Sequence, residues 1–209
     1  LPDYGTTDYE HELAVYRHIM AITEYALDLP YCDTACGPFL YGYAKCDGYN
    51  EALVMALRSC GIPCMVAAGY ATDTGDEEES GANNGHGWSL VQINGNWYQT
   101  DITWDDTAAE GAPDVTLFLP YFNRTDELIY ASHTLFDGMA ATGLPVCDHT
   151  EDNFYVRRGD MIAAGADVYA AVNSAVDRAM ESGEKEIPLS FESKSDYTIA
   201  EIALNSILE

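Results

Sequence analysis

Two segments in the N-terminal half repeat apolar residues at the spacing of an amphipathic helix. The first, residues 9–28, has them at Leu13, Tyr16, Ile19, Met20, Ile22 and Ala26. The second, residues 46–60, has them at Tyr49, Leu53, Ala56, Leu57 and Cys60. Apolar residues three or four positions apart share one face of a helix, and a glycine such as Gly61 commonly ends one. We therefore predict helices over both segments, with residues 29–42 as a loop between them.

The middle of the chain carries strand patterns instead. Residues 62–71, IPCMVAAGYA, form a short apolar run typical of a strand buried on both faces. Residues 86–104 hold two strand-like runs on either side of Asn94-Gly95, the dipeptide that most strongly favours a two-residue hairpin turn. Residues 72–85 are polar, acidic and rich in glycine, so we expect a loop there.

The C-terminal part of the chain is less regular. Residues 105–150 show short elements at best, and a new pattern begins near Asn153. We expect one domain over residues 1–150, with residues 151–209 as an α/β extension packed on the same domain. The elements predicted in this extension are a helix over residues 160–180, a strand over 186–191 and a final helix over 195–208.

Composition and charge narrow the class of protein. The chain is 47% hydrophobic and 21% charged, as globular domains are, and no apolar run approaches the roughly 18 residues that a membrane span needs. Its 9 basic and 35 acidic residues give a formal net charge of −26. That charge argues against nucleic acid and anionic membrane surfaces as partners, because both are polyanions. Two interpretations of this charge remain, a solvated acidic surface and the attraction of cationic substrates.

The cysteine pattern favours thiols or disulfides over a metal site. Two pairs among the six cysteines share a C-x3-C spacing, which does not match the paired C-x2-C spacing typical of zinc. Disulfides of an exported protein and plain buried thiols stay open, and we expect a secreted or cell-surface location. We expect no metal and no other cofactor. If Cys46 is set aside, five cysteines remain, so at least one of them is unpaired.

The predicted hairpin places a histidine near an aspartate. With a two-residue turn at Asn94-Gly95, Ile93 faces Asn96, and His86 and Asp101 project from the same face as diagonal neighbours. A carboxylate in that place can fix the tautomer and angle of the imidazole, which leaves the other ring nitrogen free. A three-residue turn would separate the pair onto opposite faces, and a surface histidine and aspartate without chemistry is the alternative.

Cys46 lies at the predicted start of a helix. The free N–H groups and partial positive charge of a helix N-terminus stabilise a thiolate, which is the nucleophilic form of cysteine. The neighbouring Asp47 opposes this effect, and Lys45 supports it only if its side chain points inward. The alternative is a small buried hydrophobic residue, which cysteine often is.

Four segments in order, KCDGYNEAL, CGIPCMVAAGY, HGWSLV and NWYQTDITWDD, resemble the core of the transglutaminase-like superfamily between Gly42 and Asp106. The later segments YFNRTDEL, SHTLF and DNFYVRRG are more weakly similar to the tails of small bacterial members. The resemblance implies a papain-like α+β fold with N-terminal helices packed on an antiparallel sheet and a C-terminal extension. It also implies Cys46 as nucleophile, His86 as general base and acid, and Asp101 as the orienting carboxylate.

The sequence departs from the papain pattern at the oxyanion hole. Papain relatives place a glutamine upstream of the cysteine, but the only glutamines here are Gln92 and Gln99. Transglutaminases often use an aromatic side chain instead, and the backbone N–H of Cys46 is a further donor. The aromatic candidates for the oxyanion hole and substrate groove are Tyr41, Tyr43, Trp88 and Trp104. For Trp88 and Trp104, packing in the core is an equal alternative. Calcium activation is not implied, because DITWDD does not match a calcium loop.

These features predict a cysteine-dependent acyl-transfer enzyme that acts on peptide or carboxamide bonds of a peptide or protein substrate. We favour hydrolysis, by a protease or amidase. A protein-glutamine transglutaminase and a non-catalytic cell-surface binding module of the same fold are the alternatives. His133 and His149 are expected in loops without a role, and the oligomeric state is not predicted.

Overall fold

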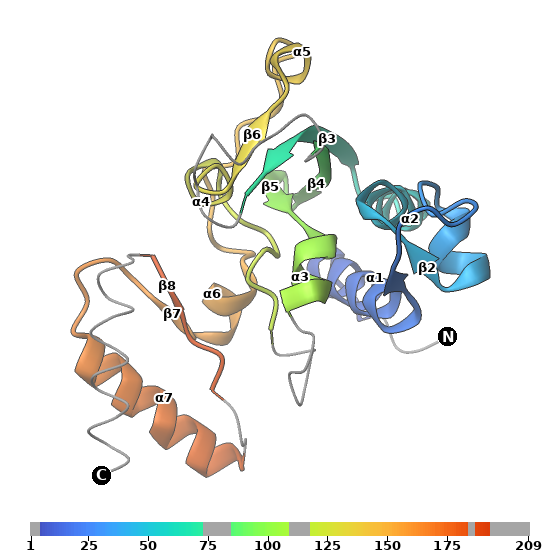
Figure 1. Ribbon diagram of the computed structural model, residues 1–209. Helices are drawn as coiled ribbons and strands as arrows, with labels where there is room; N and C mark the ends of the chain where they lie inside the picture. The colour runs from blue at the N-terminus through green and yellow to red at the C-terminus, as the bar shows by residue number, and fades with distance from the viewer. Residues whose placement is uncertain (1–4, 73–84, 109–117, 184–186, 193–209) are drawn as a thin grey trace. The chain divides into compact units, whose positions relative to one another are not determined.

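The computed structural model describes residues 5–72, 85–108, 118–183 and 187–192 (Figure 1). The chain divides into two compact units, Leu1–Asp152 and Asn153–Glu209, which we describe separately. No helix among the described residues is long and apolar enough to cross a membrane. The predicted loop at residues 72–85 and the predicted helix at residues 195–208 lie almost wholly outside the described residues.

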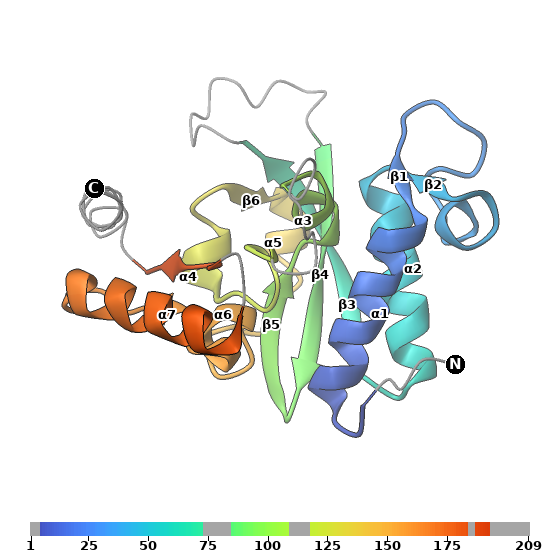
Figure 2. The same cartoon turned by 90° about the horizontal axis from the view of Figure 1, so that it is seen from below.

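The first unit is built on a four-stranded antiparallel sheet with the strand order β5-β4-β3-β6. Its strands are β3 (Cys64–Ala71), β4 (Gly85–Ile93), β5 (Asn96–Thr100) and β6 (His133–Leu135). Helix α2 (Cys46–Ser59) packs on β3 and β4, and α1 (Asp8–Ile22) packs beside α2 (Figure 2). This arrangement of N-terminal helices on an antiparallel sheet is the predicted α+β fold.

The hairpin between β4 and β5 has the predicted register. Asn94 and Gly95 both adopt positive φ angles, 54° and 90°, as the two central residues of a type I′ turn do. Ile93 is therefore paired with Asn96, and Ser89 with Thr100. The strands run on from this turn toward His86 on one side and Asp101 on the other.

Helix α1 is shorter than its sequence pattern predicted. It starts with a capping box between Thr7 and Glu10 and ends at Ile22. The next residues, β1 (Glu24–Tyr25), pair in parallel with β2 (Tyr43–Ala44), so a tertiary strand pairing replaces the last helical turns. The predicted loop between the two helices contains a short π-helix, η1 (Gly37–Tyr41).

Strand β6 was not predicted, and a glycine on β3 makes room for it. Gly69 is paired with His86 on one side and with Leu135 on the other. A Cβ atom at Gly69 would collide with the backbone oxygen of Thr134. Because glycine has no Cβ atom, β6 can approach β3 closely at the level of His86.

The remaining elements of the first unit are short, as the irregular pattern of residues 105–150 indicated. They are α3 (Ile102–Ala108), α4 (Asp126–Ile129) and α5 (Asp137–Ala140). Trp88 and Leu90 of β4 are fully buried and pack with Ala67 and Cys147. This cluster anchors the central strand of the sheet, so the position of His86 at its start depends on the core.

The second unit consists of two helices and a two-stranded parallel sheet. The helices are α6 (Phe154–Arg158) and α7 (Val168–Ser182), and the strands are β7 (Met161–Ile162) and β8 (Ser190–Phe191). Helix α7 begins later than predicted, because Asp167 caps it and β7 precedes it. A small hydrophobic cluster of Ile162, Val168 and Val172 holds the described part together.

Candidate active site

Cys46 is the first residue of α2, after Lys45 in an extended conformation. The side chain of Cys46 is buried, with 8% of its surface exposed. Lys45 forms an ion pair of 3.0 Å with Asp47. The positive charge of Lys45 therefore offsets the acidic neighbour that would oppose a thiolate. All six cysteines are free, so Cys46 is available as a thiol.

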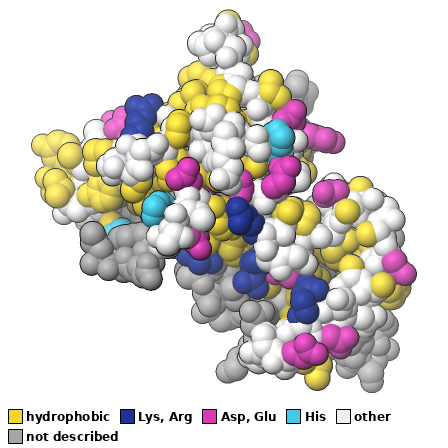
Figure 3. Space-filling view, turned by 180° about the vertical axis from the view of Figure 1, so that it is seen from behind, with side chains coloured by type: hydrophobic (Ala, Val, Ile, Leu, Met, Phe, Trp, Pro, Cys, Tyr) yellow, Lys and Arg dark blue, Asp and Glu magenta, His cyan; other side chains and the backbone are white. Residues whose placement is uncertain are grey.

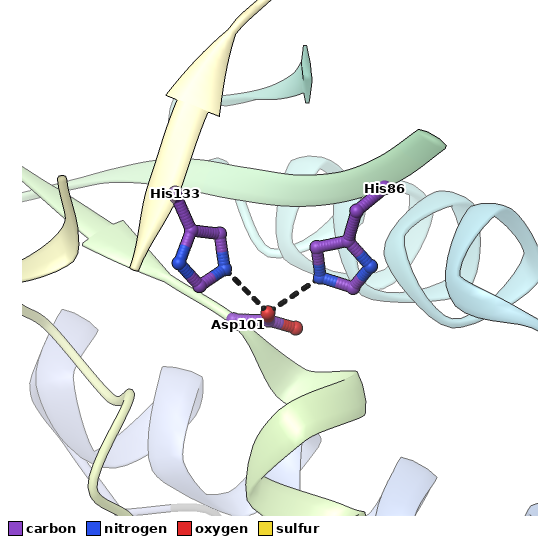
Figure 4. A group of neighbouring side chains, drawn as sticks. All are labelled: His86, Asp101 and His133. Atoms are coloured by element: carbon purple, nitrogen blue, oxygen red, sulfur yellow. Dashed lines mark hydrogen bonds and ion pairs between the residues drawn. The ribbon is translucent and has the colours of Figure 1, made fainter. Parts of the chain in front are cut away.

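His86 and Asp101 meet as the hairpin register requires. The Nε2 atom of His86 lies 2.6 Å from Oδ2 of Asp101, and the carboxylate is fully buried (Figure 4). The other oxygen, Oδ1, accepts hydrogen bonds from the backbone N–H groups of Thr103 and Trp104 at 3.1 and 3.2 Å. Asp101 thus caps the start of α3 while it holds the imidazole.

Charge and hydrogen bonding shift both pKa values in the direction of an ion pair. Burial alone lowers the pKa of His86, but the charge of Asp101 and hydrogen bonds with Asp101 and Cys46 raise it to about 10. Burial raises the pKa of Asp101, but His86 and His133 lower it to about 2. At neutral pH the carboxylate is therefore ionised and the imidazole carries a positive charge beside the thiol. Because Nε2 of His86 is bound to Asp101, Nδ1 is the ring nitrogen that remains for an interaction with Cys46.

His133 belongs to the same cluster, and the prediction that it lies in a loop was wrong. It opens strand β6, is almost fully buried, and its Nε2 atom lies 3.0 Å from Oδ2 of Asp101 (Figure 4). The hydroxyl of Ser132 lies 2.9 Å from its Nδ1 atom. A strand of three residues has too few positions for a periodic pattern, so the alternation of apolar and polar residues could not reveal this contact.

Asn50 is a second residue that sequence reasoning missed. It lies one turn after Cys46 on α2, is fully buried, and donates hydrogen bonds to the carbonyls of Cys46 and Gly87 at 2.8 and 2.7 Å. Its side-chain oxygen accepts a bond of 2.6 Å from the hydroxyl of Ser89. Asn50 therefore ties the cysteine helix to the strand that carries His86. A polar residue on the buried side of a helix was the available signal.

The aromatic candidates for the oxyanion hole and substrate groove differ in burial and in hydrogen-bond partners. Trp88 is fully buried and its indole N–H donates to Gln99 at 2.7 Å, which favours the core-packing alternative over an oxyanion donor. The hydroxyl of Tyr43 donates to the carbonyl of Pro30 at 3.1 Å. Tyr41 is half exposed and stacks on Tyr43, with ring centroids 5.9 Å apart.

Trp104 lies near His86, and Tyr25 lies near Cys46. The ring of Trp104 is 5.7 Å from the ring of His86, so it borders the candidate site. Burial, and next the charge of Cys46, raise the pKa of Tyr25, which places this half-exposed tyrosine near the thiol. The sequence did not indicate Tyr25 as a site residue, because the predicted first helix included it.

A metal could in principle bind at His86, Asp101 and His133, whose ligand atoms lie within 4.8 Å of one another. The Nε2–Oδ2 distances of 2.6 and 3.0 Å are shorter than the separation of roughly 3.3 Å between ligands that bind tetrahedral zinc at about 2.0–2.1 Å. Both are normal hydrogen-bond lengths. We therefore interpret the cluster as two histidines bonded to one carboxylate.

The acidic charge does not gather at one place on the face in Figure 3, where Asp and Glu side chains are spread among other residues. Hydrophobic side chains also gather at one edge of that face. Spread acidic side chains are what a solvated surface needs. For this face, the distribution favours general solubility over a docking patch for cations.

The first unit thus combines an α+β fold with a cysteine at the start of a helix and a histidine–aspartate pair at the adjacent sheet. These features define the class of protein to which the chain is compared. Residues 3–102 match the sequence model of the transglutaminase-like superfamily. This part of the chain is therefore similar to that superfamily, whose members typically use cysteine-based catalysis. Cys46, His86 and Asp101 all lie inside the matched residues.

Two solved structures are similar to the chain, at low identity. One is a candidate cysteine protease from Cytophaga hutchinsonii, with 22% identity, a TM-score of 0.38, and coverage of 46% of this chain and 31% of that chain. The other is a TGase, with 13% identity, a TM-score of 0.41, and coverage of 78% of this chain and 36% of that chain. This chain thus aligns with about a third of the length of either. No curated protein matches it.

Proposed function

We propose that this protein is a cysteine enzyme of acyl transfer that acts on peptide or carboxamide bonds. The observation that carries the proposal is the position of His86, whose Nε2 atom lies 2.6 Å from buried Asp101 while Cys46 contributes to its raised pKa. In this proposal the activity resides in residues 1–150, with residues 151–209 as an extension. All six cysteines are free, so the secreted or cell-surface location stays a prediction without support from disulfides.

The first half of the proposed reaction forms an acyl-enzyme. The thiolate of Cys46 attacks the carbonyl carbon, and the backbone N–H at the start of α2 stabilises the oxyanion that develops. As the tetrahedral intermediate collapses, the C–N bond breaks and the imidazolium of His86 donates its proton to the leaving amine. Asp101 keeps the ring in the orientation and tautomer that this transfer requires.

The second half differs only in the acceptor of the acyl group. His86, now neutral, removes a proton from water or from an amine, which then attacks the thioester and releases Cys46. We assign hydrolysis first, because water needs no binding site of its own whereas an amine acceptor does. Transamidation is the second candidate, and the similarity of residues 3–102 to the transglutaminase-like superfamily favours it.

The test of the proposal is selective alkylation. Native protein treated with a low concentration of iodoacetamide at pH 6 should be labelled at Cys46 before the exposed Cys36 and Cys60, which serve as internal references. The substitution His86→Ala should abolish this preference. Slow and equal labelling of all thiols would instead indicate a binding module without turnover.

A second measurement separates the two reactions. The protein is incubated with a glutamine-containing peptide and a fluorescent primary amine. Incorporation of the amine, with one ammonia released for each amine incorporated, indicates a transglutaminase, whereas ammonia or cleaved peptide without incorporation indicates hydrolysis. Cys46→Ala serves as the control that should lack both products.

A further inference from the structure

The carboxylate of Asp101 receives four hydrogen bonds, and one of them is not explained by the proposed reaction. Its Oδ1 atom accepts hydrogen bonds from two backbone N–H groups of α3, and its Oδ2 atom accepts hydrogen bonds from both His86 and His133. Four donors satisfy all the acceptor sites that a carboxylate offers. His133 therefore takes a share of the charge that would otherwise act on His86 alone.

The neighbours of His133 show which ring nitrogen donates to Asp101. Asp101 is ionised, because its pKa is lowered to about 2, and so it can only accept hydrogen bonds. Nε2 of His133 must then carry a hydrogen, and the hydroxyl of Ser132 lies 2.9 Å from Nδ1 of the same ring. Ser132 in turn bonds to the hydroxyl of Tyr121. The result is a chain of side chains from Tyr121 to Asp101.

The surroundings hold this chain in place. The ring of His133 lies 4.7 Å from the ring of Trp104, 5.0 Å from that of Trp88 and 5.9 Å from that of Tyr121. A buried ring packed against aromatic faces has few alternative rotamers. His133 is thus fixed both by its hydrogen bonds and by its packing, as a supporting group for a reactive centre must be.

Resting on the proposed function, we propose that His133 is a positioning residue that holds Asp101 and shares its negative charge, so that His86 remains free to activate Cys46. Without the donor on β6, the full charge of Asp101 would act on the imidazole. The ring would be bound more tightly by Asp101, and its positive charge would be neutralised more completely. It would then stabilise the Cys46 thiolate less well.

The pH response of this cluster depends on a small set of groups. Cys46 faces His86 from α2, Asp101 follows β5, and Asp105 lies on α3. Burial raises the pKa of Asp105 well above its usual range, and hydrogen bonds from Tyr16 and the backbone of Tyr121 oppose this shift. Tyr121 and the guanidinium of Arg124, which lies 5.5 Å from the Tyr121 ring, complete the set.

The experiment compares His133→Met with His133→Gln, two variants of similar shape. Glutamine retains an N–H donor near the position of Nε2, whereas methionine has none. The protonation midpoint of His86 is followed by 15N NMR on protein labelled at histidine, and the rate of Cys46 alkylation is measured at pH 6. We expect His133→Met to raise the midpoint of His86 and to slow alkylation about 10- to 100-fold, as small misplacements of reacting groups do. His133→Gln should restore both values to near those of the wild type.

Two results would overturn the proposal. One is a folded His133→Met variant with an unchanged His86 midpoint and alkylation rate. The other is a His133→Gln variant that behaves like the methionine variant, because the role of His133 would then be packing alone. If His133→Met does not fold, Ser132→Ala removes only the hydroxyl that bonds Nδ1, and it should move both readouts in the same direction by a smaller amount. No change in either readout for Ser132→Ala would equally reject the proposal.

The NMR titration also separates this inference from the proposed function. If wild-type Cys46 is not labelled preferentially, the acyl-transfer proposal fails. The midpoint of His86 still reports whether His133 shares the charge of Asp101. If Cys46 is labelled preferentially but the protonation midpoint of His86 does not change with the donor at position 133, only the inference about His133 fails.

Discussion

The side chain of Asn50 donates a hydrogen bond of 2.7 Å to the carbonyl of Gly87, and this bond joins the helix of Cys46 to the strand of His86. The same amide nitrogen also bonds to the carbonyl of Cys46, one helical turn back. The distance between the thiol and the imidazole therefore depends on a residue whose side chain bonds to the backbone of Cys46 and Gly87 and to the hydroxyl of Ser89. A buried amide with all of its partners in place is rigid and costly to remove.

Asn50→Ala should reduce both stability and reactivity. It leaves the Ser89 hydroxyl and the Gly87 carbonyl without their buried partner, and each such loss costs about 1–3 kcal/mol. We expect the free energy of unfolding in urea to fall by about 3 kcal/mol. The alkylation rate of Cys46 at pH 6 should fall about tenfold or more, because the two elements can move apart.

Asn173→Ala is the matched control for this change. Asn173 also donates from a helix to a backbone carbonyl, at 2.9 Å to Tyr169, but it is exposed on α7. Its loss should change the free energy of unfolding by less than about 0.5 kcal/mol. Equal effects of the two substitutions would show that Asn50 does not link the two elements.

Asp101→Asn should remove the negative charge beside the imidazole of His86 and keep the fold. Asparagine can still cap α3 through its side-chain oxygen, because asparagine and aspartate are comparable N-caps. The pKa of His86, raised to about 10 by Asp101 and Cys46, should fall toward or below 6.5, since burial then dominates. Alkylation or turnover at pH 8 should drop by about 10³- to 10⁴-fold, with a smaller loss at pH 5.5. A loss of equal size at both pH values would contradict the charge argument.

The sequence predicted the parts of the fold that regular patterns specify. The apolar spacing of residues 46–60 placed α2, and the Asn94-Gly95 turn fixed the register that brings His86 toward Asp101. Both features are local, because a helix face and a two-residue turn are determined by residues close in sequence. The resemblance to the transglutaminase-like core covered the same region and is supported by the family match over residues 3–102.

The features that sequence analysis missed are those that depend on distant contacts. The pattern of the first helix continued to Ala26, but Glu24–Tyr25 pair with Tyr43–Ala44, so a long-range strand pairing overrides helix propensity. Strand β6 has only three residues and exists because Gly69 lets it approach β3. His133 could not be assigned to the site before that approach was known.

Glu12 on α1 provides a test of stability against pH. It is fully buried, accepts one hydrogen bond of 2.8 Å from Asn123, and burial raises its pKa from 4.5 to about 8. A raised carboxyl pKa means that the folded state holds the proton more tightly than the unfolded state. The free energy of unfolding should therefore fall as pH rises from about 4.5 to 8, by up to about 1.4 kcal/mol for each pH unit.

Glu12→Gln should remove this dependence. The variant should be more stable than the wild type at pH 8 and of similar stability at pH 4, when urea unfolding is measured at both values. Glu10→Gln is the control, because Glu10 is exposed on the same helix and bonds the backbone of Thr6 and Thr7. Its effect should be small and should not favour the variant at high pH. A pH profile of Glu12→Gln parallel to that of the wild type would show that Glu12 is not the buried titrating group.

Gly69→Ala should displace β6 from the sheet and with it His133. The new methyl group would meet the backbone oxygen of Thr134, and a backbone atom cannot rotate away as a side chain can. Forcing an extra methyl group into such a contact typically costs about 1–3 kcal/mol. Gly85→Ala tests whether the effect is specific, since a Cβ atom there finds only the ring of Phe136 at an ordinary 3.7 Å. We expect Gly69→Ala, but not Gly85→Ala, to lower the midpoint of urea unfolding and to shift the 15N signals of His133. If the two alanine variants behave alike, the close approach at Gly69 does not hold β6 in place.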